Sequence, residues 1–217
     1  NAIANDELSI TALTGAFSDK NAADNKTVTL SGVSYGGADL GNYTITDQAD
    51  TTASIAKRTV TLSATKTYDG NTSLTGSQVT IGTGVTVVGV TETLTYSSAT
   101  ADSKNVAGAD GNTATADNFI KTITLGNATD GSGGLAANYQ LPTLNAANAS
   151  VTVNPLAVTL TAPTVSKTYD GGTAYTTTAE NLTAITGSAL VGGDTVTAAT
   201  ISYGNRNVGS GNKKVTL

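Results

Sequence analysis

Residues 60–70 read Val-Thr-Leu-Ser-Ala-Thr-Lys-Thr-Tyr-Asp-Gly, an alternation of apolar and hydroxyl side chains that runs into a turn sequence. Successive side chains of a β-strand point to opposite faces, so this alternation predicts a strand with one buried and one exposed face. The same pattern occurs at residues 151–153 and 215–217. Helical spacing of apolar residues is nearly absent, and residues 176–185, the best candidate, predict at most one helical turn. The sequence therefore predicts an all-β chain.

The end of this stretch is repeated along the chain. Lys-Thr-Tyr-Asp-Gly at residues 66–70 returns at residues 167–171, 101 residues later, and Asn42-Tyr43 returns as Asn138-Tyr139 after 96 residues. Self-similarity at a fixed period is the sequence signature of a repeat architecture. The candidate structural residues of these two motifs are Lys66, Tyr68, Asp69, Gly70, Lys167, Tyr169, Asp170, Gly171, Asn42, Tyr43, Asn138 and Tyr139.

A third marker supports the same repeat. Ser18-Asp19-Lys20-Asn21 corresponds to Asp102-Ser103-Lys104-Asn105 and to Asn205-Arg206-Asn207, and the three markers keep the same order along the chain. Such a common order indicates that whole units, and not single motifs, are repeated. We therefore predict the rear part of a first unit at residues 1–56, a complete unit at 57–154 and the front part of a third unit at 155–217.

A unit near 100 residues is too long for a solenoid rung and has the size of an independent small domain. Clusters of Gly, Asn and Asp separate the predicted strands at intervals of roughly 8 to 15 residues, a spacing typical of β-sandwiches. We expect tandem antiparallel, immunoglobulin-like β-sandwich units in an elongated array. Units with a β-grasp-like sheet are the alternative.

Charge and hydropathy exclude two classes of partner. The net charge is −5, and the 11 basic residues are scattered, whereas nucleic-acid binding needs clustered Lys and Arg. No apolar run reaches the length of about 18 residues that a membrane-spanning helix needs, so we expect no membrane insertion. The chain begins at Asn1, contains no Met and has no signal-like segment, so we expect an interior piece of a longer protein.

Few residues of this chain could support catalysis. There is no His and no Cys, so neither a Ser-His nor a Cys-His nucleophile can be built. Carboxylate pairs could hydrolyse glycosides, but such sites usually lie among aromatic platforms and Trp is absent. We expect that the chain is not an enzyme and that it uses no cofactor.

The Lys-Thr-Tyr-Asp-Gly positions resemble the YDG and MBG-type repeats of large bacterial haemagglutinin-like exoproteins and adhesins. The pair Gly193-Asp194 before a Val-Thr strand and the segments Lys104-Asn105-Val106 and Arg206-Asn207-Val208 support the resemblance. It implies an extracellular protein of the bacterial cell surface, often secreted by a two-partner route in Gram-negative bacteria. It also implies a role in attachment, aggregation or biofilm matrix.

One loop sets the middle unit apart. About ten extra residues stand between Val106 and Asn118 compared with the other units, and they include Asp110, Gly111, Asn112 and Asp117. The pattern of an EF-hand is missing, so we expect a solvated polar loop, with a calcium site as the less favoured interpretation and no metal site assigned. Residues 107–118 are the candidate binding loop for a polysaccharide or another cell-surface protein.

The repeated Tyr-Asp-Gly motif predicts structure before chemistry. We expect the Tyr to point inward with its hydroxyl on a backbone group, and Asp-Gly to make the turn that ends the strand. The alternative is a binding or metal element, since Asp69 and Asp170 offer carboxylates beside glycines. The lysines of the motif suggest a further alternative, an amide cross-link from Lys66 or Lys167 to an Asn, which needs a nearby carboxylate and an apolar setting.

These observations favour a structural stalk or spacer whose partners are the neighbouring repeat units. The alternative is a module that binds a glycan or matrix component directly through residues 107–118. The third unit stops where the first unit continues, so we also expect that the incomplete ends either fray or are completed by head-to-tail strand donation between chains.

Overall fold

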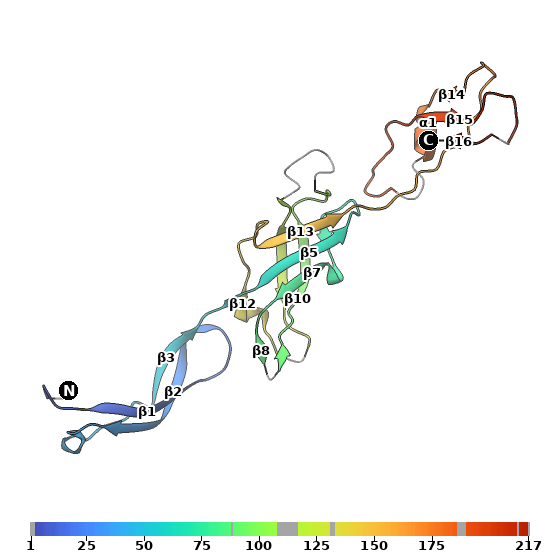
Figure 1. Cartoon of the computed structure of the whole chain (residues 1–217). Helices are drawn as coiled ribbons and strands as arrows, with labels where there is room; N and C mark the ends of the chain where they lie inside the picture. Colours follow the sequence, from blue (N-terminus) through green and yellow to red (C-terminus); the bar gives the residue numbers. More distant parts are fainter. Residues whose placement is uncertain are drawn as a thin grey trace. The chain divides into compact units, whose positions relative to one another are not determined.

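The computed structural model describes residues 3–87, 89–107, 117–130, 133–185, 190–211 and 213–216. In these residues the chain consists mostly of short β-strands with one α-helix, which confirms the all-β prediction (Figure 1). The strands are β1 (Ser9–Phe17), β2 (Ala23–Gly36), β3 (Asp50–Ile55), β4 (Arg58–Thr59), β5 (Thr61–Thr67), β6 (Ser73–Leu74), β7 (Val79–Gly82), β8 (Thr86–Val87), β9 (Val90–Thr91), β10 (Thr95–Ala101), β11 (Ile120–Gly126), β12 (Tyr139–Gln140), β13 (Ala149–Asn154), β14 (Ala174–Tyr175), β15 (Ile201–Tyr203) and β16 (Val215–Thr216). The helices are α1 (Ala179–Ile185) and the 3-10 turns η1 (Leu40–Asn42), η2 (Gly76–Gln78) and η4 (Ala136–Asn138).

The chain divides into two compact units. The first comprises Asn1–Ser63, Thr80–Ala99 and Thr122–Leu144, and the second comprises Ala64–Val79, Thr100–Lys121 and Asn145–Leu217. The repeat boundaries given above remain predictions from the sequence.

The first sheet, in the order β1-β2-β3, belongs to the first compact unit. Its strands are antiparallel, with Phe17 opposite Val28 and Thr29 opposite Asp50. Two irregularities interrupt the β1–β2 register between Ile10 and Thr14. The face of β2 toward the interior carries Lys26 and Val28, both buried.

Two three-stranded sheets, β13-β5-β7 and β11-β10-β6, hold most of the core. Every second residue of β5 is buried and the residues between them are exposed, which confirms the alternation in residues 60–67. Strand β13 alternates in the same way. The buried apolar residues of these sheets are Leu62, Ala64, Leu74, Ala99, Ala101, Ile120, Ile123, Ala149, Val151 and Val153.

Short pairings complete the strand arrangement. Strands β8 and β9 form a hairpin in which Val87 is opposite Val90. Strands β4 and β12 pair in parallel, with Tyr139 opposite Arg58. This parallel pair departs from the antiparallel prediction, and it is only two residues long on each side.

The sheet β14-β15-β16 belongs to the second compact unit, as does α1. The helix is seven residues long and therefore exceeds the single turn that we expected. Its start is capped reciprocally, because Asn181 N donates to Thr178 Oγ1 at 3.3 Å and Thr178 N donates to Asn181 Oδ1 at 3.1 Å. Because this stretch contains many threonines, the capping role of Thr178 could not be recognised from the sequence. No helix of the described residues is long and apolar enough to span a membrane.

Candidate functional site

The side chain of Lys66 lies completely inside the protein at the end of β5. Its Nζ donates to Asn71 O at 3.0 Å and to Ser73 O at 2.8 Å, and it forms an ion pair with Asp69 Oδ1 at 2.7 Å. An ammonium group has three N–H donors and no acceptor, so these three oxygens match its protonated form. The Nζ also lies 3.4 Å from Asn71 Oδ1, so a lysine, a side-chain amide and a carboxylate meet here, as the amide cross-link requires. A nucleophilic lysine would have to be neutral, and the cross-link stays a prediction.

Asp69 fixes the turn that follows the strand. Its Oδ1 also accepts a hydrogen bond from Asn71 N at 3.2 Å, and Asn71 Oδ1 in turn accepts from Ser73 N at 2.8 Å. Burial by itself would raise the pKa of Asp69, but the hydrogen bonds from Lys66 and Asn71 outweigh it and hold the pKa below its usual value. Gly70 has a φ of 78°, which L side chains rarely adopt.

The second copy of the motif repeats this arrangement at residues 167–171. Lys167 Nζ contacts Asp170 Oδ1 at 2.7 Å and Ala174 O at 2.8 Å, and Gly172 N donates to Asp170 Oδ1 at 2.9 Å. The hydrogen bond from Lys167 is the main reason that the pKa of Asp170 is lowered. Lysine, aspartate and a glycine with positive φ therefore act together as a closed turn in both copies.

The tyrosines of the motif do not occupy the interior position that we expected. Tyr68 is half-buried, and its hydroxyl donates to the carboxylate of Asp194 at 2.8 Å instead of to a backbone group. Tyr169 is 61% exposed. The expectation failed because the Asp-Gly turn already closes the end of the strand, so the tyrosine lies beside this turn instead of under it in the interior.

The second marker places a tyrosine at the end of a 3-10 turn in both copies. Asn42 and Asn138 are the last residues of η1 and η4, and Tyr43 and Tyr139 follow as C-caps. Tyr139 is buried, and its hydroxyl donates to Glu92 Oε2 at 2.5 Å. Burial and the neighbouring Glu92 raise the pKa of Tyr139 to about 12.

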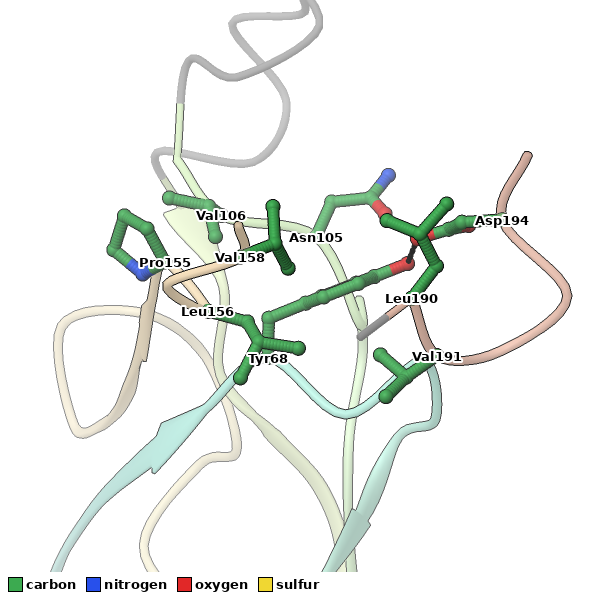
Figure 2. A pocket seen from close by; sticks show the side chains of 9 residues that line it. All are labelled: Tyr68, Asn105, Val106, Pro155, Leu156, Val158, Leu190, Val191 and Asp194. Carbon is green, nitrogen blue, oxygen red and sulfur yellow. Dashed lines mark hydrogen bonds between the residues drawn. The ribbon is translucent and has the colours of Figure 1, made fainter. Parts of the chain in front are cut away.

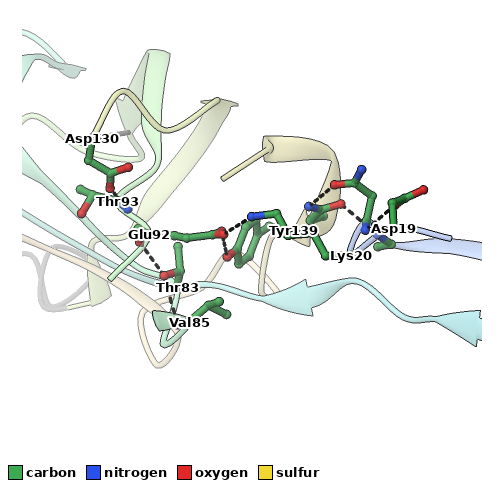
Figure 3. A network of polar contacts seen from close by, with 11 residues as sticks. Asp19, Lys20, Thr83, Val85, Glu92, Thr93, Asp130 and Tyr139 are labelled. Carbon is green, nitrogen blue, oxygen red and sulfur yellow. Dashed lines mark hydrogen bonds and ion pairs between the residues drawn. The ribbon is translucent and has the colours of Figure 1, made fainter. Parts of the chain in front are cut away.

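Glu92 is the centre of a polar network inside the first compact unit (Figure 3). Its side chain is 4% exposed and binds Tyr139 through Oε2 and Lys20 Nζ through Oε1, the latter at 3.2 Å. Its backbone is held as well, because Glu92 N donates to Val85 O and Thr83 Oγ1 donates to Glu92 O. Both carboxylate oxygens are therefore used inside the protein.

The other copy of this marker contains a matching pair of tyrosine and acid. The Tyr43 hydroxyl donates to Asp6 Oδ2 at 2.5 Å, and it accepts a hydrogen bond from Ile3 N at 2.9 Å. Sequence reasoning missed the acids that pair with these tyrosines. A local signal exists, since Asp6, Glu92 and Asp194 each stand two residues before a Leu or Val.

The third marker is a recurring side-chain turn. Asp19, Ser103 and Asn205 each accept a hydrogen bond from the backbone amide two residues later, at 2.7, 3.1 and 3.1 Å. A lysine then binds the same oxygen in two copies, Lys26 to Asp19 at 2.6 Å and Lys213 to Asn205 at 2.5 Å. The hydrogen bond from Lys26, followed by that from the amide of Asn21, lowers the pKa of Asp19.

The middle copy of this turn uses an amide side chain as well. Asn118 is 6% exposed, accepts from Ser103 N at 3.0 Å and donates to Ser103 O at 2.9 Å. Of the candidate loop residues, Asp117 is exposed, and Asp110, Gly111 and Asn112 lie outside the described residues. Within the described ranges, no three His, Cys, Asp or Glu residues are grouped so that they could hold a metal ion.

Comparison with known families identifies one domain family. The family model described as the YDG domain matches residues 1–53 and 154–217, more than half of the chain. The chain belongs to the YDG domain family. No curated protein and no solved structure matches it.

One cavity lies beside the Tyr-Asp-Gly turn of the YDG chain, in the second compact unit (Figure 2). Its volume is about 350 Å³, and apolar side chains form most of its wall. Its polar side chains are Asn105, Asp194 and Tyr68, whose hydroxyl is bonded to Asp194. The lining residues are Tyr68, Asn105, Val106, Pro155, Leu156, Val158, Leu190, Val191 and Asp194.

Proposed function

We propose that this YDG chain is a spacer segment of a bacterial surface or secreted adhesin. In this role it would support attachment, aggregation or biofilm matrix outside the cell by holding a binding region away from its anchor. Its partners would be neighbouring repeat units, and no residue would perform chemistry.

The observation that carries the proposal is the internal use of the repeated polar groups. Among the described residues, no buried side-chain nitrogen or oxygen lacks a hydrogen-bond partner. Four buried polar residues in or beside the repeat markers, Lys26, Lys66, Glu92 and Asn118, each bind other groups of the chain. Groups that act on a ligand or substrate need donors or acceptors aimed into an open site, whereas fully satisfied networks rigidify a fold.

The strand arrangement supports tandem sandwich units for this role. We propose that β13-β5-β7 and β11-β10-β6 are the two sheets of an immunoglobulin-like sandwich within residues 57–154. Both sheets contribute buried residues, among them Leu62 and Val151 from one and Ile120 and Ala101 from the other. Antiparallel pairs with buried alternate residues are the usual construction of such a module.

The surface composition fits an extracellular spacer. Charged residues are only 12% of the chain and cysteine is absent. A polar surface with few charges has little long-range attraction for other macromolecules. The family resemblance in the sequence supports the extracellular location.

The test compares binding of the chain with binding of a loop deletion. The full chain and a variant that lacks residues 107–117, and so keeps the buried Asn118, are labelled and applied to a glycan array and to immobilised matrix proteins. The spacer function predicts no binding by either protein at micromolar concentration. Binding by the full chain that disappears with the loop would replace the spacer function by direct recognition, and unchanged circular dichroism should show that both proteins are folded.

A further inference from the structure

The chain contains the same acidic turn twice. Asp6 N donates to Ile3 O at 3.1 Å, and Asp194 N donates to Val191 O at 3.1 Å. The third residue of each turn has a positive φ, 78° at Asn5 and 81° at Gly193. We call residues 3–6 and 191–194 leading turns; the next strand along the chain is β1 after the first turn and β15 after the second.

The second compact unit shows how a leading turn is received (Figure 2). Asp194 accepts the Tyr68 hydroxyl, and Lys104 Nζ lies 5.9 Å from the centre of the Tyr68 ring. Gly70 and Gly192 approach so closely that a Cβ on Gly70 would lie 2.4 Å from Gly192 Cα. The Tyr-Asp-Gly turn therefore carries a contact surface in addition to closing its own strand.

In the first compact unit the corresponding acid forms an ion pair with the lysine of the third marker (Figure 3). Lys20 is the counterpart of Lys104 in the third marker, and Glu92 is the counterpart of Asp194. Glu92 uses one oxygen for Tyr139 of its own unit and the other for Lys20. Beside this pair, Ala22 N donates to Asn138 Oδ1 and Asn138 Nδ2 donates to Asn21 Oδ1, so the whole turn is held.

The surface at Tyr169 that corresponds to the one around Tyr68 is exposed. Tyr169 is the counterpart of Tyr68, and Arg206 and Val208 are the counterparts of Lys104 and Val106. Tyr169 is 61% exposed, Val208 is 85% exposed and Arg206 is exposed. A Cβ on Gly171 would meet nothing within 4 Å, in contrast to Gly70. We call Tyr169, Gly171, Arg206 and Val208 the open receiving face.

The leading turn at residues 3–6 is exposed as well. Ile3 is 70% exposed, which is unusual for a large apolar side chain. Asp6 binds Tyr43 through Oδ2, as Glu92 binds Tyr139, and among the described residues no hydrogen bond reaches its Oδ1. In Glu92 the corresponding oxygen holds the lysine of the third marker. Asp6 therefore presents one carboxylate oxygen that matches an arginine or lysine.

We propose that the leading turn of one chain binds the open receiving face of a second copy, head to tail. Arg206 pairs with Asp6 Oδ1, and Ile3 covers the apolar surface of Tyr169 and Val208. The surfaces differ on the two sides, so the contact is heterologous and continues into open chains instead of closing as a dimer. This inference rests on the spacer function and names the partner of its exposed faces.

The test is sedimentation equilibrium of the full chain from about 10 μM to about 1 mM, because short linkers hold neighbouring modules at millimolar effective concentration. We expect the weight-average mass to more than double over this range, and to fall again in high salt because an ion pair contributes. Asp6→Lys and Arg206→Glu should each remain monomeric. A mixture of the two variants should regain association, because each provides the surface that the other has lost.

Two control variants carry the same charge changes on exposed residues away from both surfaces, Asp24→Lys and Lys57→Glu. They should associate as the parent chain does, and unchanged circular dichroism should show that all variants are folded. A parent chain that stays monomeric at 1 mM would overturn the inference. Association that survives both Asp6→Lys and Arg206→Glu would also overturn it and would indicate another contact, such as strand donation. Neither result affects the spacer function, since the glycan and matrix assay needs no contact between copies.

Discussion

Replacing Lys66 by methionine removes one ammonium group and keeps most of the aliphatic stem. The ammonium is 0% exposed and binds two backbone carbonyls and the carboxylate of Asp69. Removal of one partner of a buried ion pair costs about 3–5 kcal/mol, and hydrogen bonds to charged groups contribute about 1.5–3 kcal/mol each. Asp69 is 43% exposed, so water can replace the lysine there. The loss then falls mainly on the two carbonyls, and we expect a decrease of about 3 kcal/mol in the free energy of unfolding.

Urea unfolding followed by circular dichroism measures the loss, and amide hydrogen exchange at Asn71 and Ser73 reports the turn itself. Lys167→Met is the matched variant, since that side chain is 21% exposed and Asp170 is 60% exposed. We expect it to cost about 1 kcal/mol. A Lys66→Met protein within about 0.5 kcal/mol of the parent, with unchanged exchange at Ser73, would refute the structural role of the buried lysine.

Three further predictions follow from the turns and the tyrosine network. The pKa of Asp69 is lowered, so its contribution to stability is present above its unfolded pKa of about 3.9 and is lost as the pH falls through the lower folded value. Measurements of unfolding free energy below pH 5 should show this decline, and Asp69→Asn should make the decline smaller. The pKa of Tyr139 is raised to about 12, so its contribution to stability is complete below about pH 10 and declines between pH 10 and 12. Absorbance of tyrosinate should show one group titrating late. Tyr139→Phe leaves Glu92 without this donor, so it should remove that group and lower the free energy of unfolding by about 1–3 kcal/mol. Gly70→Ala and Gly171→Ala both force a side chain to positive φ at about 1–2 kcal/mol, but only at Gly70 would the new Cβ meet Gly192, so thermal denaturation should show the larger loss there; equal losses would contradict the close contact.

Local pattern was sufficient to predict the strands with one buried face. In β5 the alternation of Leu62 and Ala64 with hydroxyl residues matches the burial of the strand, because side-chain direction in a strand depends only on position. The length of α1 was underestimated, since the Thr178–Asn181 cap depends on which hydrogen bonds form. The parallel pairing of β4 with β12 was also missed, because parallel partners are distant in sequence.

The site was predicted as motifs and not as contacts. Tyr139 was recognised as a marker, but its partner Glu92 stands 47 residues earlier, and only the fold brings the two together. The expectation that Tyr68 binds a backbone group was wrong for the same reason, because Asp194 is 126 residues away in the chain. Repetition shows that a motif is needed in every unit, whereas the partner of each side chain depends on tertiary structure.

Reach through a polymer layer tests the spacer function most directly. A small domain of known binding specificity is attached to beads through this chain, or through a Gly-Ser linker of equal length whose root-mean-square reach is about 80 Å. The beads are then offered ligand that lies beneath a polymer brush thicker than this reach. The spacer function predicts capture with the YDG chain, loss of capture with the flexible linker, and no capture by the chain without its tip. Capture by the chain alone, or equal capture with both linkers, would contradict it.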